Sequence, residues 1–377
     1  IGLCSTDMLY FAVGKLDYDG GAMVTASHNP PQWNGLKLCR TGALSLSGEE
    51  GLPDIKDAII HDRYRSVAHV GAIHRQDMGD SFADHVLAFI DRTVIRPFTI
   101  VIDAGNGMAG KVAPLIFTHL PCRIIPLYFD LDGSFPHHIP SPIAPENIRD
   151  LQRFILDNNA DLGIAFDGDA DRVFLVDEQA EAISGGLMTA IVAQSLLRRH
   201  RGATILYNLI CSRVVPEIIK EGGGHPVVTR VGHSYIKQHM RQMNGLFAGE
   251  HSGHYYFRDN YYADSGIIAA LYVLELLSQG KTPLSEIVRP LKRYAASGEI
   301  NTPVEDKEGK MREIAERFSD AEEISYLDGV SICYPDVWFN VRPSNTEPLL
   351  RLNVEGASQE KMEMMKDRVL AMIRGTT

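Results

Sequence analysis

The residues best suited to chemistry lie in the stretch DGDADR, residues 167 to 172. Asp167, Asp169 and Asp171 directly follow the apolar run DLGIAF, which predicts a buried strand. Three carboxylates this close together repel one another unless a cation lies between them, and hard cations such as Mg2+ prefer oxygen ligands. Arg172 beside them could bind phosphate oxygens. The stretch therefore predicts a divalent metal site that also handles phosphate.

Other interpretations of the acidic stretch are possible. A calcium-binding EF-hand nearly fits, with Glu178 at the right offset, but Arg172 stands where the sharp turn needs glycine and VFLVD after it predicts a strand. A phosphatase, in which the aspartate after the strand is itself the nucleophile, fits the same spacing. A solvated acidic turn is disfavoured by the repulsion between its charges.

A second candidate is Ser27, in the stretch TASHNPPQWNGLK. Alone, this serine is most simply a turn or cap residue. As a nucleophile it would need a base, and His28 is adjacent in sequence without having to be adjacent in the site. The chain around Ser27 has no G-x-S-x-G pattern, so an α/β-hydrolase triad is not expected.

A third stretch, GEHSGHYYF, contains Glu250, Ser252 and His254. In an extended segment, residues two apart point to the same side of the chain. We therefore expect these three side chains to face one ligand together, and a carboxylate beside hydroxyl and imidazole groups suits a sugar. A polar strand edge is an equally good explanation of this stretch on its own. His233, after a predicted strand, is by itself a capping or packing residue.

The fourth stretch, NVRPSNTEPLLRL, lies near the C-terminal end of the chain. It places a guanidinium, hydroxyls and an amide between two prolines, at Arg342, Ser344, Asn345 and Thr346. Together with exposed backbone N–H groups, these could bind an oxyanion. Alone, an ordinary turn is the better explanation, because Ser, Asn and Thr favour turns for local reasons.

Composition narrows the class of protein. A chain of 377 residues with 45% hydrophobic residues predicts two to four globular domains. The net charge of −11 argues against binding to nucleic acid or to an anionic membrane. No apolar run is long enough to cross a bilayer. The 5 cysteines are scattered, without a C-x-x-C pair, which predicts neither disulfides nor a cysteine zinc site and fits the reducing cytoplasm.

The elements that must position these residues can be predicted from hydrophobic patterns. From about residue 99 the chain alternates apolar runs such as TIVID and DLGIAF with amphipathic stretches, which indicates α/β units with mainly parallel sheets. From about residue 294 several strands and two helices predict an α+β unit with an antiparallel sheet. The two α/β units after residue 99 could be variants of one design.

Taken together, TASHNP, DGDADR, GEHSGH and RPSNTEP resemble, in this order, the four active-site loops of the α-D-phosphohexomutases. The resemblance covers essentially the whole chain. It implies an α/β fold of three similar α/β domains with mixed, mainly parallel sheets plus a C-terminal α+β domain, around a central cleft. We expect boundaries of 1–74, 75–180, 181–293 and 294–377, and a further N-terminal segment of the first domain ahead of Ile1.

The same resemblance implies roles for the site residues. Ser27 would carry a phosphoryl group, and Asp167, Asp169 and Asp171 would hold Mg2+ together with a phosphate oxygen on that serine. Sugar hydroxyls would meet Glu250 and Ser252. The existing phosphate of the substrate would meet Arg342, Ser344, Asn345 and Thr346, while Lys37, His28, Arg172, His233 and His254 would lie near the transferring group or the sugar.

The implied reaction interconverts the 1-phosphate and 6-phosphate of mannose, and also of glucose, through a phosphoserine and a hexose 1,6-bisphosphate. Lys37 is the first candidate for the general acid/base, with His233 or His254 as the second. Hexose phosphates are the expected partners. A phosphoglucosamine mutase and a Mg-dependent sugar phosphatase are the alternatives. At Ile210 some relatives carry a lysine, which puts a phosphate contact there in doubt.

Overall fold

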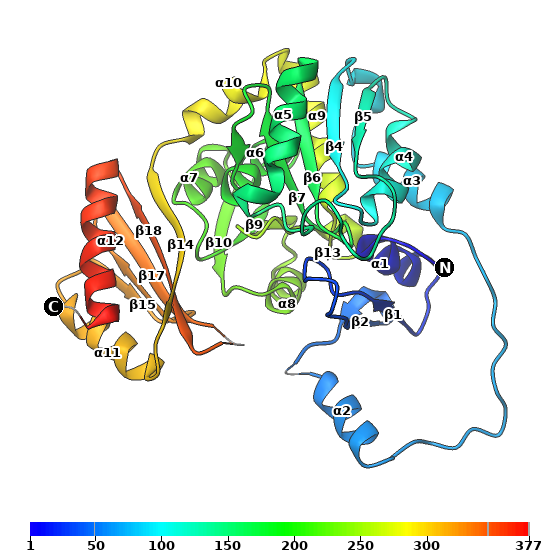
Figure 1. Cartoon of the computed structure of the whole chain (residues 1–377), viewed down its shortest axis with the longest axis horizontal. Helices are drawn as coiled ribbons and strands as arrows, with labels where there is room; N and C mark the ends of the chain where they lie inside the picture. Colours follow the sequence, from blue (N-terminus) through cyan, green and yellow to red (C-terminus); the bar gives the residue numbers. More distant parts are fainter. Residues whose placement is uncertain (49, 345–346, 376–377) are drawn as a thin grey trace.

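The computed structural model describes residues 1–48, 50–344 and 347–375. Its described strands form four sheets, one of three strands and three of five strands. The C-terminal sheet and its helices lie to one side of the larger body that contains the other three sheets (Figure 1).

The first sheet is small and entirely antiparallel, in the order β1-β2-β3. Its elements are α1 (Thr6–Lys15), β1 (Gly20–Val24), β2 (Leu36–Arg40), β3 (Leu44–Ser45) and α2 (Leu52–Ile60). Parallel pairing needs a crossover of a dozen or more residues, and the segment 25–35 that joins β1 to β2 is too short for one. This sheet therefore differs from the mainly parallel sheets expected here. The segment 61–78 after α2 runs without regular structure to the next domain (Figure 1).

The second and third sheets share one pattern. The second has the order β5-β4-β6-β7-β8 and the third β10-β9-β11-β12-β13. In each, the first three strands are parallel to one another, and each of the last two is antiparallel to the strand before it. The strands of the second are β4 (Thr99–Asp103), β5 (Arg123–Leu127), β6 (Leu162–Phe166), β7 (Val173–Asp177) and β8 (Ala182–Ile183). Those of the third are β9 (Thr204–Asn208), β10 (His225–Thr229), β11 (Phe247–Gly249), β12 (Tyr255–Phe257) and β13 (Ala263–Asp264). The prediction that these units are variants of one design is confirmed.

Helices cover these two sheets. They are α3 (Gly79–Leu87), α4 (Ala109–Phe117), α5 (Arg149–Asn158), α6 (Gly185–Leu197), α7 (Val214–Glu221), α8 (His233–Met243), α9 (Gly266–Gly280) and α10 (Leu284–Val288). Helix α9 is apolar on all sides and buried over nearly its whole length, as expected for a helix inside a large core. Strand β6 is buried at every residue, as expected of a strand covered on both faces.

The C-terminal sheet is antiparallel throughout, in the order β14-β18-β17-β16-β15. Its elements are β14 (Ala295–Pro303), α11 (Lys307–Arg317), β15 (Glu323–Ser325), β16 (Val330–Cys333), β17 (Val337–Pro343), β18 (Leu349–Gly356) and α12 (Gln359–Arg374). Both helices pack on this sheet around a core cluster separate from that of the α/β sheets. The predicted fold class, α/β domains followed by an α+β domain, is confirmed, while the domain boundaries remain predictions.

The repeated pattern places two of the motifs in equivalent positions. Residues 167–172 connect β6 to β7, and residues 250–254 connect β11 to β12, so each motif follows the last parallel strand of its sheet. An antiparallel bridge between Arg172 and His254 joins the two connections directly. The topology alone therefore brings the acidic loop and the polar loop to one point.

Candidate active site

The serine loop, residues 25–35, lies against the acidic loop. The Ser27 hydroxyl donates to Asp167 Oδ2 at 2.8 Å, and Arg172 Nη2 donates to the same hydroxyl oxygen at 3.2 Å. One carboxylate and one guanidinium thus hold a single hydroxyl, across about 140 residues of sequence. The arrangement offers both an acceptor for the serine proton and positive charge for an anion on the serine.

The backbone of Ser27 is held in an unusual conformation. Its φ is +54°, in the left-handed region that non-glycine residues rarely adopt. The Ser27 N–H donates to Thr25 Oγ1 at 2.8 Å, and a Cβ on Gly168 would lie only 2.3 Å from the Ser27 carbonyl oxygen. Such strained residues often occur at functional sites, where the surrounding structure fixes them.

The three carboxylates of the acidic loop converge. Asp167, Asp169 and Asp171 are at most 2% exposed, and one oxygen from each lies within 4.8 Å of the others. Asp169 Oδ1 and Asp171 Oδ1 are buried without a hydrogen-bond partner among the described residues. Burial and the Asp169 charge raise the pKa of Asp167 to about 7. Crowded oxygens with unused acceptor capacity fit a hard divalent cation.

Lys37 also reaches this cluster. Its ammonium lies 2.7 Å from Asp169 Oδ2 and also pairs with Asp171 Oδ2. Burial alone would lower the pKa of Lys37, but the two carboxylates hold it well above its usual value. The structure therefore brings the predicted acid/base candidate beside two of the three predicted metal ligands.

Two threonines that the sequence reasoning missed also bind Asp169. Thr6 Oγ1 donates to Asp169 Oδ2 at 2.8 Å, and Thr25 Oγ1 donates to the same oxygen at 3.1 Å. The Thr6 N–H, at the start of α1, donates to the Asp169 carbonyl at 3.0 Å. Thr25 lies inside the TASHNP motif and could have been suspected, whereas nothing in the sequence near Thr6 marks it.

His28 contacts both Ser27 and Arg172. Its Nδ1 lies 2.6 Å from Arg172 Nη2 and 3.3 Å from Ser27 Oγ. Since a guanidinium only donates, Nδ1 must be an acceptor, so the imidazole is neutral on that nitrogen. Burial and the Arg172 charge lower the pKa of His28 to about 4, which agrees with a neutral ring.

The loop of residues 250–254 is a turn, not the extended segment predicted from its sequence. The Gly253 N–H donates to the Glu250 carbonyl at 3.1 Å and closes the turn between β11 and β12. The prediction of a common side set by strand alternation was therefore wrong. Gly253, with a φ of +87°, favours a turn here, and the antiparallel pairing of β11 with β12 requires one.

The polar groups of this loop have separate partners. Glu250 is 2% exposed; it accepts from Asn208 Nδ2 at 3.2 Å and from the Tyr256 hydroxyl. Ser252 Oγ lies 3.0 Å from His254 Nδ1. Asn208 and Tyr256 were not predicted from the sequence. They fix the Glu250 carboxylate in place, and burial raises its pKa.

His233 is the first residue of α8 and follows Gly232, whose φ is +132°. Burial, followed by the charge of Lys237 on the same helix, lowers the pKa of His233 to about 4. The charges of Lys37 and Arg172 also act on it, so the ring lies within electrostatic reach of the acidic loop.

The fourth motif extends from strand β17. Arg342 Nη2 pairs with Glu299 Oε2 at 2.7 Å, and Arg351 Nη1 pairs with the other oxygen of Glu299 at 2.9 Å. Arg351 Nη2 also lies 3.5 Å from Ser344 Oγ. Arg342 and Ser344 thus stand with a second arginine that sequence reasoning missed. The predicted residues Asn345 and Thr346 lie outside the described residues.

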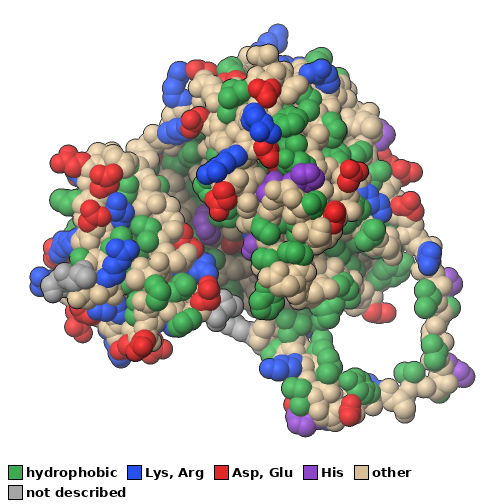
Figure 2. Space-filling view, viewed as in Figure 1, with side chains coloured by type: hydrophobic (Ala, Val, Ile, Leu, Met, Phe, Trp, Pro, Cys, Tyr) green, Lys and Arg blue, Asp and Glu red, His purple; other side chains and the backbone are tan. Residues whose placement is uncertain are grey.

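The surface is hollowed between the C-terminal body and the larger body (Figure 2). Histidine and acidic side chains are visible in this hollow (Figure 2). The predicted central cleft agrees with that view.

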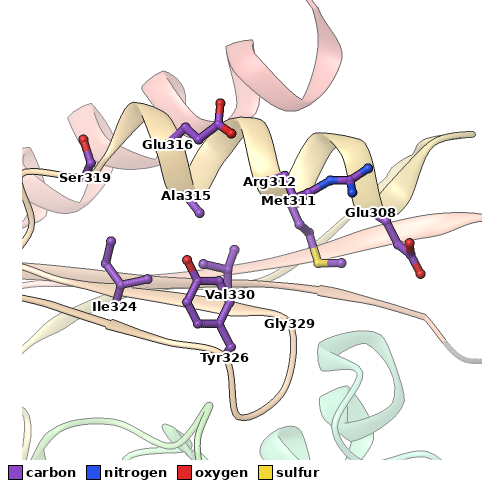
Figure 3. Close-up of a pocket in the computed structure, with 10 residues that line it drawn as sticks. All are labelled: Glu308, Met311, Arg312, Ala315, Glu316, Ser319, Ile324, Tyr326, Gly329 and Val330. Atoms are coloured by element: carbon purple, nitrogen blue, oxygen red, sulfur yellow. The ribbon is translucent and has the colours of Figure 1, made fainter.

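A separate cavity of about 550 Å³ lies within the C-terminal domain, between α11 and the strands β15 and β16. Met311 from the helix and Tyr326 beyond β15 face it (Figure 3). None of the described candidate site residues lines this cavity, so we do not assign it to the site. Among the described residues, no helix has the length and apolar character needed to cross a membrane.

Comparisons with known proteins identify the family to which the chain is similar. Sequence models of the phosphoglucomutase/phosphomannomutase family match the chain in four parts: domain I over residues 1–64, domain II over 80–182, domain III over 184–294 and the C-terminal domain over 299–372. Phosphohexose mutases from Xanthomonas campestris pv. campestris are 37% identical over 378 residues, which is 100% of this chain and 84% of theirs. Phosphomannomutase from Escherichia coli K12 is 37% identical, over 98% of this chain and 83% of its own.

Solved structures show the same similarity. A phosphoglucomutase/phosphomannomutase family protein from Burkholderia thailandensis superimposes with a TM-score of 0.90 at 32% identity, over 98% of this chain and 82% of its own. An N-acetylphosphoglucosamine mutase from Aspergillus fumigatus, solved in complex with GlcNAc-6P and magnesium, has the same fold at a TM-score of 0.70 and 15% identity, over 98% of this chain and 93% of its own.

Proposed function

The chain belongs to the phosphoglucomutase/phosphomannomutase family and is a hexose-phosphate mutase, and from this premise we propose that it interconverts the 1-phosphate and 6-phosphate of mannose, and also of glucose. The phosphoryl group passes through Ser27. Phosphorylated Ser27 gives its phosphoryl group to the free hydroxyl of the hexose phosphate, which forms a hexose 1,6-bisphosphate. This bisphosphate reorients in the cleft and returns its other phosphoryl group to the serine.

The placement of the Ser27 hydroxyl carries this proposal. It lies 2.8 Å from a carboxylate oxygen of Asp167 and 3.2 Å from Arg172 Nη2, beside the three-carboxylate cluster. Phosphoryl transfer depends mainly on positioning and on stabilising charge at the transferring oxygens. Arg172 is already aimed at the oxygen that would carry the phosphoryl group, so it would stabilise that charge without rearrangement.

The resident cation of the acidic cluster is Mg2+ in this proposal. Asp167, Asp169 and Asp171 would hold it together with a phosphate oxygen on Ser27. The unused buried oxygens of two of these aspartates support the fit, as does the magnesium in the Aspergillus fumigatus structure. When bound, Mg2+ would neutralise negative charge on the transferring phosphoryl group.

Lys37 is our first candidate for the group that transfers the proton to and from the sugar hydroxyl, and His254 or His233 is the second. The Lys37 ammonium lies 2.7 Å from Asp169 Oδ2, and its raised pKa keeps it protonated, which is the form that can donate a proton. His28 keeps a neutral ring against Arg172 and would orient that guanidinium toward the phosphoryl group.

The remaining residues would bind the rest of the substrate. Glu250, Ser252 and His254 face the sugar hydroxyls, with His233 beside them. The phosphate that is not being transferred binds at Arg342, Ser344, Asn345 and Thr346. Because this second group belongs to the C-terminal domain, closure of that domain would exclude water and protect the phosphoserine from hydrolysis.

Phosphorylation of Ser27 tests the proposal. Intact-mass measurement and peptide mapping of the purified chain should find one phosphoryl group on the Ser27 peptide after incubation with a hexose 1,6-bisphosphate. Ser27→Ala should lose both this label and turnover, whereas the control Ser81→Ala, at an exposed position on α3, should keep both. An enzyme that stays fully active without any label on Ser27 would refute the proposal.

The same assay separates the alternatives. A sugar phosphatase would release inorganic phosphate from mannose 1-phosphate without forming the 6-phosphate. A phosphoglucosamine mutase would prefer glucosamine phosphates when these are compared side by side with mannose and glucose 1-phosphates. The names of the relatives favour neither alternative. We also propose a cytoplasmic location, in keeping with five cysteines that are all free thiols.

A further inference from the structure

A buried lysine, Lys237, lies close to the candidate site. Lys237, on α8, is 4% exposed, and its ammonium forms an ion pair with Asp264 Oδ1 at 2.6 Å. The same ammonium lies 3.9 Å from the centre of the Tyr10 ring, on α1. Burying a lysine ammonium is costly unless it is paired, and Asp264 provides the partner here.

The other oxygen of Asp264 faces the site. Asp264 Oδ2 lies 3.8 Å from His254 Nε2, and Asp171 Oδ1 lies 3.7 Å from the same nitrogen. On the other side of the ring, His254 Nδ1 is 3.0 Å from Ser252 Oγ. The imidazole therefore stands between the Ser252 hydroxyl and two carboxylates. Only one of these carboxylates, Asp171, belongs to the predicted metal ligands.

The fold explains why these groups meet. Asp264 on β13 pairs with Tyr256 on β12, and β12 directly follows the loop that carries His254. Lys237 follows His233 by four residues on α8, so the two lie on one face of that helix. The Tyr256 hydroxyl binds Glu250, and the backbone pairing of Tyr256 with Asp264 places Asp264 beside His254.

We propose that Lys237 and Asp264 are positioning residues. Lys237 holds the Asp264 carboxylate toward His254, and this carboxylate keeps the imidazole beside Ser252 and the transfer site. The inference rests on the proposed function, because it concerns the orientation of a group that meets the substrate hydroxyls. Neither Lys237 nor Asp264 has to touch the reacting atoms. The 3.8 Å between Asp264 Oδ2 and His254 Nε2 is longer than a hydrogen bond, as is common in active sites before the substrate binds.

A merely structural ion pair makes a different prediction. Replacing a buried ion pair by apolar residues of similar size is often neutral or stabilising, whereas removing one partner is strongly destabilising. If Lys237 and Asp264 only stabilise the fold, K237M/D264L should restore both stability and turnover. If they position His254, the double variant should restore stability alone, because leucine has no oxygen to face Nε2.

The experiment compares K237M, K237M/D264L and D264N in the full chain, by urea unfolding and by kcat and KM for hexose 1-phosphate. We expect K237M to unfold at lower urea. K237M/D264L should recover the wild-type midpoint yet keep a kcat about 10- to 100-fold lower, with KM within about threefold. D264N keeps an oxygen for Lys237 but removes the negative charge near His254, and it should show the same loss of kcat.

The matched control is the ion pair between Arg199 and Glu275, which has a buried carboxylate remote from His254. R199M/E275L should leave kcat unchanged. Wild-type kcat in either K237M/D264L or D264N overturns the inference; if the double variant does not fold, D264N decides alone. Failure of the proposed function is recognised separately, as wild-type protein without mutase turnover or Ser27 phosphorylation, and the inference would then fail with it.

Discussion

Gly168 offers a direct test of how tightly the serine loop must be held. It lies in the acidic loop, between two of the carboxylates, and a Cβ at this position would meet the Ser27 carbonyl oxygen at 2.3 Å. Real Cβ atoms essentially never approach another atom closer than 3.0 Å. In Gly168→Ala the Ser27 carbonyl would therefore have to move away by about 0.7 Å, the difference between these two distances.

The acidic loop cannot easily move back to relieve this contact. The Met108 N–H donates to the Gly168 carbonyl at 2.9 Å, and a Cβ on Gly107 would lie 2.5 Å from that same oxygen, so the other side is already closely packed. The displacement therefore falls on Ser27. A misplacement of about 1 Å can cost on the order of 100-fold in rate, so we expect kcat to fall roughly 30- to 100-fold.

The assay measures kcat and KM for mannose and glucose 1-phosphates, together with the rate of Ser27 phosphorylation by a hexose 1,6-bisphosphate. Both rates should fall by a similar factor, while KM stays within about threefold because the proposed sugar and phosphate contacts lie elsewhere. Overpacking should also lower the free energy of unfolding by about 1–3 kcal/mol. Gly133→Ala, whose Cβ would have no atom within 4 Å, is the control. Wild-type kcat in Gly168→Ala would refute the reasoning.

Three further predictions concern the metal, the phosphate and the pH. Mg2+ at about 100 times its Kd should raise the unfolding free energy by about 2.7 kcal/mol, and EDTA should reverse this; an unchanged urea midpoint would argue against a metal site. Arg342→Lys should raise KM about tenfold with kcat nearly unchanged, since lysine lacks the forked donors, whereas exposed Arg317→Lys should do nothing; equal KM values would remove Arg342 from the phosphate site. Burial lowers the pKa of His251 from 6.5 to about 4, so its contribution to stability is complete above pH 6.5 and is lost as the pH falls toward 4. In urea titrations from pH 4 to 7, His251→Gln should flatten this dependence, and an unchanged slope would contradict it.

Much of the fold was predictable because its signals are local. The strands TIVID, DLGIAF and VFLVD are apolar runs, and the structure has β4, β6 and β7 there. The first sheet was harder to predict, since strand pairing depends on the connection between β1 and β2 and not on the strands themselves. The turn at residues 250–254 was missed for a similar reason. Alternation of polar residues is compatible with a strand, but the antiparallel partner β12 forces the chain to reverse.

The acidic cluster was likewise determined by the sequence, because three aspartates two residues apart in one loop must lie close together wherever that loop goes. Order along the chain also identified the family, since four motifs in sequence are far more specific than any one of them. In both cases the information lies in near neighbours or in their order.

Only the tertiary structure decided which distant groups complete the site. Thr6, Lys37 and Ser27 reach the acidic loop from more than 130 residues away in sequence, and Lys237 reaches Asp264 through the packing of α8 against the third sheet. No spacing rule predicts such contacts, because they depend on how helices, sheets and domains pack together. The sequence thus determined the chemical groups and their order, and packing decided their partners: Asp167 and Arg172 meet the Ser27 hydroxyl only in the folded structure.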